Sequence, residues 1–124
     1  MNTQYHFPIS SSTVANCTVK TIRDESVGTI KDIMLETETG EVAYVVLSVD
    51  SGFLNLGSKL LALPWEAFDF HGHQRDVILV NVEKEKLENA PGFEDDNWPV
   101  GPQHEFINDV HTYYGFDRRR ALIE

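Results

Sequence analysis

The sequence predicts a mainly β fold: a small antiparallel barrel or sandwich, followed by a short helix and a C-terminal helix. Runs rich in β-branched and aromatic residues recur at intervals of about 8–12 residues, which is typical of small antiparallel folds. Near the end of the chain the apolar residues change to helical spacing. The chain has 124 residues, which is enough for one domain with its own core.

The first half of the chain predicts three strands. Residues 1–13 are polar and without periodicity, so we expect a flexible arm. TVKTI (18–22) and TIKDIMLET (29–37) predict the first two strands, and Gly40 suits a hairpin bend. EVAYVVLSV (41–49) predicts the strongest strand. Both of its faces are apolar, so we expect it to be covered on both sides.

The second half begins with an unusually apolar loop. Its large side chains, Phe53, Leu54 and Leu56, lie between Gly52 and Gly57. A surface loop seldom carries three such groups unless another surface covers them. The loop therefore indicates a contact with another part of the chain or with another molecule.

Two further strands and two helices complete the prediction. KLLALPWEAFDF (59–70) predicts a strand interrupted at Pro64, because proline cannot donate to a sheet ladder. DVILVNV (76–82) predicts the last strand, and residues 83–90 predict a short charged helix. After a Pro- and Gly-rich connector, QHEFINDVHTYYG (103–115) has apolar residues at helical spacing.

Charge and composition exclude some functions. The chain has 20 acidic and 10 basic residues and a net charge of −10. Phosphates are repelled by such a surface, so we expect no nucleic-acid partner, whereas a basic protein partner fits. A single cysteine, Cys17, and the lack of a signal-like N-terminus or a long apolar run predict a cytoplasmic protein without membrane insertion.

Residues 27–48 and 52–68 resemble the PRC-barrel domain, a family named for the cytoplasmic domain of the H subunit of photosynthetic reaction centres. Similarity to its stand-alone bacterial members extends through residues 87–99 and 110–115. The residues that carry the resemblance, besides Lys31 and the run 43–46, are Gly28, Asp32, Gly40, Gly52, Gly57, Pro64 and Trp65.

The resemblance implies a small, highly bent β-barrel without a known catalytic site. It places the barrel domain at residues 14–90 and a C-terminal loop and helix at 91–124. Members of the family mostly act as binding or assembly modules, so we expect neither an enzyme nor a cofactor. An accessory role in ribosome or membrane-complex assembly is an alternative that depends on the analogy of fold alone.

Asp69 and the turn at HGHQRD (71–76) that follows it contain residue types that can bind a metal. Asp69, His71 and His73 alternate along the chain, and a carboxylate with two imidazoles can bind a metal. Side chains in a turn do not keep the alternation of a strand, however, so we expect surface residues. A small-molecule or metal-binding module remains the alternative function.

The surplus of apolar residues favours an interaction module that forms a homodimer. We expect the C-terminal helix to cover part of the barrel and a second copy of the chain to cover another part. The residues expected in the homodimer interface are Tyr44, Val46, Phe53, Leu54 and Leu56.

Overall fold

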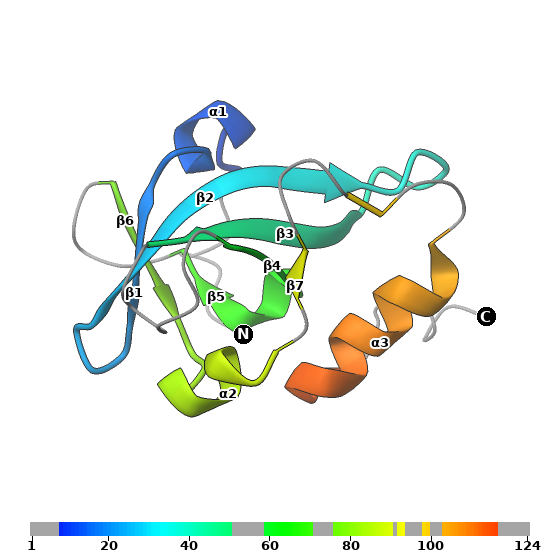
Figure 1. The fold of residues 1–124 in the computed structure, drawn as a ribbon. Helices are drawn as coiled ribbons and strands as arrows, with labels where there is room; N and C mark the ends of the chain where they lie inside the picture. Colours follow the sequence, from blue (N-terminus) through cyan, green and yellow to red (C-terminus); the bar gives the residue numbers. More distant parts are fainter. Residues whose placement is uncertain are drawn as a thin grey trace, which may run out of the picture.

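The computed structural model describes residues 8–50, 59–70, 76–90, 92–93, 98–99 and 103–116. Its elements follow one another along the chain (Figure 1) as α1 (Ser11–Val14), β1 (Thr18–Thr21), β2 (Ser26–Leu35), β3 (Val42–Val49), β4 (Lys59–Leu63), the 3-10 turn η2 (Trp65–Ala67), β5 (Phe68–Asp69), β6 (Val77–Val80), α2 (Lys84–Glu88), β7 (Gly92–Phe93) and α3 (His104–Tyr114). The expected mainly β fold with a short helix and a C-terminal helix is confirmed.

Among the described residues, the strands form one seven-stranded sheet in the order β5-β6-β1-β2-β3-β4-β7. Strands β4 and β5 lie near opposite ends of this order, yet only the η2 turn separates them in the chain. The sheet must therefore curl back on itself, and it is bent like a barrel without being closed by a strand pair between its two ends. The corner is made by Pro64, which is buried and precedes the first residue of η2.

One strand pair differs from the wholly antiparallel arrangement that we expected. Strand β6 pairs in parallel with β1, from Thr18 opposite Val77 to Thr21 opposite Val80. The reason is topological: the chain turns the corner at η2, forms β5, and returns antiparallel to β5 along the free edge of β1.

Bulges in β2 and β3 bend the sheet. Ile30 lies opposite Leu47 but Asp32 lies opposite Val46, so Lys31 is an extra residue in β2. An extra residue increases the local bend and twist of its strand. The Asp32 carboxylate accepts a hydrogen bond from the Ile33 amide at 2.9 Å next to this bulge. The Lys31-Asp32 pair thus has a structural role in curling the barrel.

Two glycines meet different requirements of the backbone. A Cβ atom on Gly28 would lie 2.0 Å from the Ser48 carbonyl oxygen on the neighbouring strand, so no larger residue fits there. Gly40 has open space around it but a φ of +79°, which side chains with a Cβ rarely adopt. It ends the β2–β3 turn, where its amide donates to the Glu36 carbonyl at 2.7 Å.

The first core lies inside the bent sheet. Its fully buried members include Val14, Val19, Val27, Ile30, Val45, Leu47, Leu61, Leu63, Val80 and Leu87. Val14 belongs to α1, which we did not predict, since residues 11–13 were expected to lie in the flexible arm. The Ser10 hydroxyl caps this helix by accepting from the Ser12 amide at 3.2 Å. The apolar anchor at Val14 and the serine cap are both visible in the sequence, but a single helical turn has no periodicity to detect.

Candidate functional site

Strand β3 is covered on both faces, as its sequence predicted. One face contributes Val45 and Leu47 to the core inside the sheet. The other contributes to a second core on the outer side of β3 and β4, where α3 lies against the sheet (Figure 1). The buried members of this second core are Ala43, Tyr44, Val46, Leu60, Ala62, Ile107 and Val110.

The expected role of Tyr44 and Val46 in a homodimer interface needs correction. Their side chains are 1 % and 0 % exposed, and α3 of the same chain covers them. While α3 lies there, neither side chain can contact a second copy. Ala43 is an extra residue in β3, because Met34 lies opposite Tyr44 and the next residue, Leu35, lies opposite Val42. This bulge brings the Ala43 side chain into the same second core. The apolar surface is therefore larger than strict alternation along β3 would make it.

A polar contact fixes the start of α3 on this face. The Tyr44 hydroxyl donates a hydrogen bond to Gln103 Oε1 at 2.8 Å, and Gln103 Nε2 donates to the Pro99 carbonyl at 3.2 Å. The Phe106 ring meets the Tyr44 ring edge to face, with centroids 5.2 Å apart. Burial raises the pKa of Tyr44 above its usual value. The face thus combines an apolar surface with one oriented hydrogen bond, as binding surfaces for amphipathic helices do.

The other end of α3 is bound to the barrel corner. His111 is 5 % exposed, and its Nδ1 donates to the Ile107 carbonyl at 3.0 Å, since a carbonyl oxygen can only accept. Its Nε2 lies 3.8 Å from Glu66 Oε1 in η2. Tyr113 reaches α2, where its hydroxyl donates to the Lys86 carbonyl at 2.6 Å. These contacts join the last turn of α3 to two separate elements of the barrel.

Tyr114 introduces a buried polar atom at the same place. Its ring packs against both cores, and its hydroxyl oxygen is buried without a hydrogen-bond partner among the described residues. Burial raises the pKa of Tyr114 far above its usual range, and the neighbouring Tyr113 adds to this effect. An unpaired buried hydroxyl costs stability.

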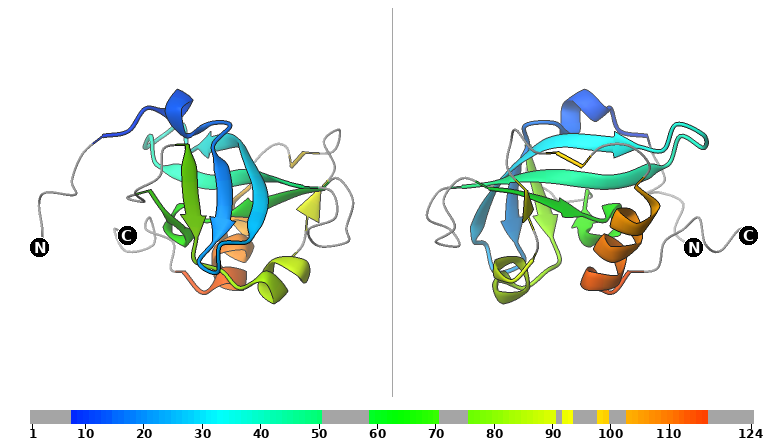
Figure 2. Two further views of the ribbon diagram at one scale, coloured as in Figure 1. Left: turned by 90° about the vertical axis from the view of Figure 1, so that its left-hand side faces the viewer. Right: turned by 45° about the vertical axis from the view of Figure 1, so that its right-hand side comes forward.

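A second part of the outer sheet surface has no described element over it. Figure 2 shows β6, β1 and β2 side by side with no helix in front of them. Cross-strand pairing places Val77, Thr18, Thr29 and Ser48 in one row across four strands. These four side chains are partly exposed, because the residues that alternate with them are buried in the inner core. We call this row the open face.

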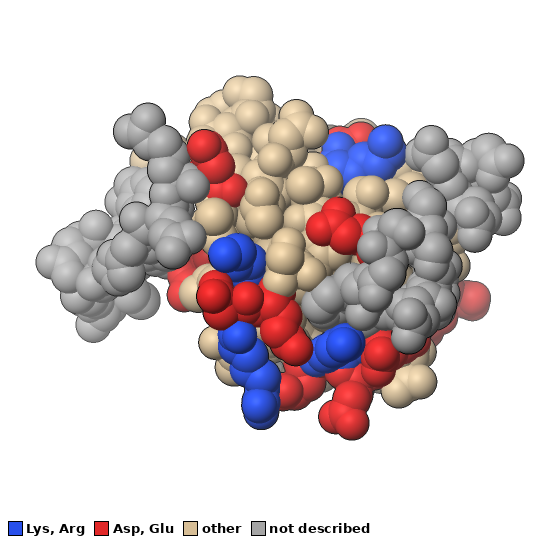
Figure 3. Space-filling model, turned by 60° about the vertical axis from the view of Figure 1, so that its left-hand side comes forward, with Lys and Arg blue, Asp and Glu red and all other residues tan. Residues whose placement is uncertain are grey.

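The four side chains of the open face are uncharged, but Lys20 and Lys31 follow Thr18 and Thr29 by two positions along the same strands and are partly or fully exposed. Figure 3 shows uncharged side chains over much of the upper part and centre of this side, acidic and basic groups also near its upper edges, and a larger mixed group of charges below. Further along β1, toward the turn that leads to β2, Lys20 Nζ lies 3.4 Å from Asp24 Oδ1, and Arg23 Nε lies 3.4 Å from Glu83 Oε1. Basic and acidic groups are therefore both available at this edge.

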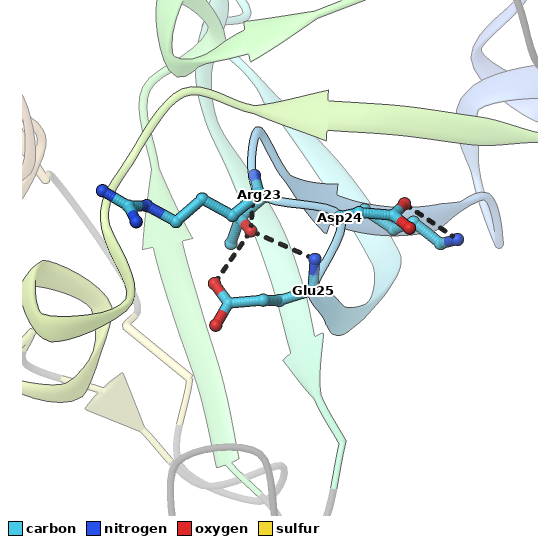
Figure 4. A network of polar contacts seen from close by, with 5 residues as sticks. Arg23, Asp24 and Glu25 are labelled. Carbon is cyan, nitrogen blue, oxygen red and sulfur yellow. Dashed lines mark hydrogen bonds and ion pairs between the residues drawn. The ribbon is translucent and has the colours of Figure 1, made fainter.

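The turn between β1 and β2 holds these charges in place (Figure 4). The buried Thr21 hydroxyl accepts from the amides of Arg23 and Glu25 at 3.2 and 3.3 Å and donates to Glu25 Oε1 at 3.0 Å. Asp24 has a φ of 66°, which aspartate tolerates better than most residues. The sequence predicted only a polar turn here; the available signal was a threonine followed by short polar residues.

Two of the remaining predicted residues can be placed in the structure. Asp69 is exposed in β5, while His71 and His73 lie outside the described residues. Within the described residues, no group of three or more His, Cys, Asp or Glu side chains could hold a metal. Trp65 lies in η2 and stacks on Phe70, with ring centroids 4.1 Å apart.

The apolar loop expected in the homodimer interface is not part of the described residues. Gly52, Phe53, Leu54, Leu56 and Gly57 lie outside the described residues. In the described part of the chain, no helix is long and apolar enough to cross a membrane.

The PRC-barrel domain family matches residues 9–87, which is more than half of the chain, so this protein belongs to the PRC-barrel family. The resemblance noted in the sequence is therefore confirmed. A comparison with curated proteins gave no match. The matched region runs from the residues before α1 into α2, whereas β7 and α3 follow it. The helix that covers the outer face of β3 and β4 is thus an extension beyond the matched domain.

Proposed function

We propose that this protein is a non-catalytic interaction or assembly module that acts in the cytoplasm as a homodimer. Membership of the PRC-barrel family suggests a non-catalytic module. The particular role as a protein-binding module is our proposal.

The observation that carries the proposal is the contact between α3 and the outer face of β3 and β4. Residues after the matched domain form an amphipathic helix that buries Ile107 and Val110 against this face. A helix of 11 residues is too short to be stable alone in water. Its folding therefore depends on the surface that the barrel offers. A barrel that binds one amphipathic segment through its outer face is suited to bind others through its remaining surfaces.

Self-association is proposed from the apolar loop. Phe53, Leu54 and Leu56 are three of the four residues between Gly52 and Gly57, and all three are large and apolar. Contiguous apolar surface of this kind marks interaction sites, and a two-fold dimer is the most frequent way of covering it. The net charge of −10 also favours a basic protein as a further partner.

The test is the mass in solution of a Leu54→Asp/Leu56→Asp double variant, measured by light scattering. We expect the unaltered protein to be dimeric and the double variant to be monomeric with an unchanged circular dichroism spectrum. A matched control, Thr37→Asp/Thr39→Asp, adds the same charge to the exposed β2–β3 turn and should remain dimeric. A double variant that unfolds would place the two leucines in the core and contradict the interface.

A further inference from the structure

We propose that the free edge of β2 between Asp32 and Leu35 binds an extended segment of a basic partner protein, which adds to the sheet as a further strand. The inference deepens the proposed function and rests on it, because it assigns the surface on which an interaction module takes up its basic partner. It does not depend on the homodimer.

The free edge exists because β2 is longer than its neighbour β1. Strand β1 pairs with β2 no further than Thr29, and the segment before β1 extends this pairing only to Ile30. From Asp32 to Leu35, β3 is the one strand of the described chain that pairs with β2. Figure 1 shows β2 and β3 running on together to their turn, away from β1 and β6. An unpaired strand edge is a template on which a further strand can pair.

Backbone groups on this edge are directed away from β3. The Ile33 amide donates to the carboxylate of Asp32 at 2.9 Å, so it points to the free edge and not into the ladder with β3. The amide and carbonyl groups of successive residues point alternately to the two sides of a strand, which directs those of Leu35 to the same edge. One residue later, the Glu36 amide donates across the β2–β3 turn to the Glu41 carbonyl at 2.8 Å, as this alternation requires. The edge therefore offers backbone groups at the spacing that an added strand needs.

Side chains along the edge add an apolar contact. Leu35 is 60 % exposed, the largest exposed fraction among the large apolar residues that the structure describes. Ile33 is partly buried and packs against the inner core. Residues two positions apart lie on the same face of a strand, so an added strand would place its own side chains beside both. Covering Leu35 would remove apolar surface from water and stabilise the contact.

The charge at this edge selects a basic segment. Asp32 lies on the edge itself and is exposed, and the turn that follows β2 carries the acidic residues Glu36, Glu38 and Glu41. Lys31 is the only basic residue from position 31 to position 41. A second copy of the chain would bring the same acidic group to the contact, whereas lysine or arginine side chains of a partner would meet opposite charges. The local charge thus favours a basic partner over a copy of this chain.

Asp32 gives the edge a means of choosing its partner. While its carboxylate accepts from the Ile33 amide, an uncharged strand must displace this hydrogen bond before it can pair fully. A lysine or arginine of the incoming segment offers the carboxylate an ionic partner, after which the Ile33 amide is available to the new ladder. Charges on edge strands commonly prevent pairing with the wrong strand, and specificity often combines such a repulsive group with an attractive one. The same carboxylate therefore disfavours neutral and acidic strands and favours basic ones.

The test measures the binding of three fluorescein-labelled hexapeptides to the full-length protein by fluorescence anisotropy. A peptide of alternating Lys and Val carries the charge and can pair as a strand. Alternating Lys and Pro has the same charge but no amide hydrogen at its prolines, and alternating Thr and Val can pair without charge. We expect the Lys-Val peptide to bind at least about fivefold more tightly than either of the others. Equal binding of Lys-Pro would overturn strand addition, and equal binding of Thr-Val would overturn the selection of a basic segment.

Variants of the protein locate the site. Asp32→Lys should weaken binding of the Lys-Val peptide at least about tenfold, because it reverses the charge on the edge. Glu85→Lys makes the same change of net charge at an exposed position of α2, far from the β2–β3 turn in Figure 1, and should leave binding within about twofold. Equal effects of the two variants would place the peptide elsewhere and overturn the inference.

A conservative variant separates recognition from mere protection of the edge. Asp32→Asn keeps an acceptor for the Ile33 amide but removes the charge. We expect it to weaken binding of the Lys-Val peptide about threefold and to leave the Thr-Val peptide unaffected. If it strengthens the binding of both peptides alike, Asp32 only guards the edge and the inference fails. This variant also decides the matter if Asp32→Lys does not fold.

Amide hydrogen exchange tests the edge without any substitution. Saturating Lys-Val peptide should slow exchange of the Leu35 amide and leave that of Glu85 in α2 unchanged. An unchanged rate at Leu35 would contradict the inference. A dimeric protein that binds none of the three peptides would also overturn it while the homodimer stands, and a monomeric protein that binds Lys-Val at this edge would do the reverse.

Discussion

The Tyr44 hydroxyl in β3 and the side chain of Gln103, the residue that precedes the C-terminal helix α3, form a 2.8 Å hydrogen bond across 59 positions of the chain. This bond joins the matched PRC-barrel domain to the segment that follows it. It orients α3 on an otherwise apolar face, and it accounts for the burial of a tyrosine that the sequence placed on an interface.

The hydrogen bond between Tyr44 and Gln103 should contribute measurably to stability. We expect Tyr44→Phe to lower the free energy of unfolding by about 1 kcal/mol, since it leaves the Gln103 amide oxygen without this donor. Gln103→Ala should have a similar effect. In urea unfolding, the double variant should lose less than the sum of the two, by roughly 0.5–1.5 kcal/mol. Full additivity would show that the two side chains do not interact.

A charge on the face of α3 that packs against the sheet should destabilise the protein. Val110 is 5 % exposed in the second core. We expect Val110→Asp to destabilise the protein by about 3 kcal/mol or more, because a carboxylate would be buried without a partner. Thr112→Asp puts the same residue on the exposed side of the same helix and should change stability by less than about 0.5 kcal/mol. Equal effects at both positions would contradict the packing of α3.

Two glycines should respond differently to alanine. Gly28→Ala would force a methyl group against the Ser48 carbonyl, so we expect the free energy of unfolding to fall by about 3 kcal/mol or more, with the yield of soluble protein as the first readout. Gly40→Ala meets no atom within 4 Å and should cost only about 1 kcal/mol through its left-handed backbone. Thermal unfolding ranks the two variants, and the opposite ranking would contradict the close approach of β2 and β3.

Replacing each of two adjacent tyrosines by phenylalanine should change the free energy of unfolding in opposite directions. Tyr114→Phe removes a buried hydroxyl that has no hydrogen-bond partner in the described structure, so we expect a gain of up to about 1 kcal/mol. Tyr113→Phe removes the 2.6 Å bond to the Lys86 carbonyl and should cost about 1 kcal/mol. Denaturant unfolding at neutral pH checks both, and a loss in both variants would show that the Tyr114 hydroxyl is satisfied.

The same tyrosine predicts how stability depends on alkaline pH. Burial raises the pKa of Tyr114, so the folded chain keeps a proton that the unfolded chain releases near pH 10. Above about pH 10 the folded state binds more protons than the unfolded state, and the free energy of unfolding falls as pH rises. Tyr114→Phe should make this fall shallower between pH 10 and 11. An unchanged slope would contradict the burial of the hydroxyl.

The strands were predictable from the sequence because β-branched residues alternate along them, and two-sided cover of β3 followed from its apolar faces. The face of the sheet on which Ala43 lies was not predictable, because a bulge opposite Met34 and Leu35 shifts this residue toward α3. The parallel pairing of β6 with β1 joins residues almost 60 positions apart, which local patterns do not encode. For Tyr44 and Val46, the sequence indicated a cover but not which one. In the structure, the C-terminal helix α3 is the element that buries both side chains.

The mass of the full-length protein in solution tests the central claim most directly. Light scattering over a concentration series from about 1 to 100 μM spans the affinities expected of a weak to moderate dimer. We predict a mass that rises to twice that of one chain and stays there. A mass equal to one chain at every concentration would contradict the homodimeric interaction module.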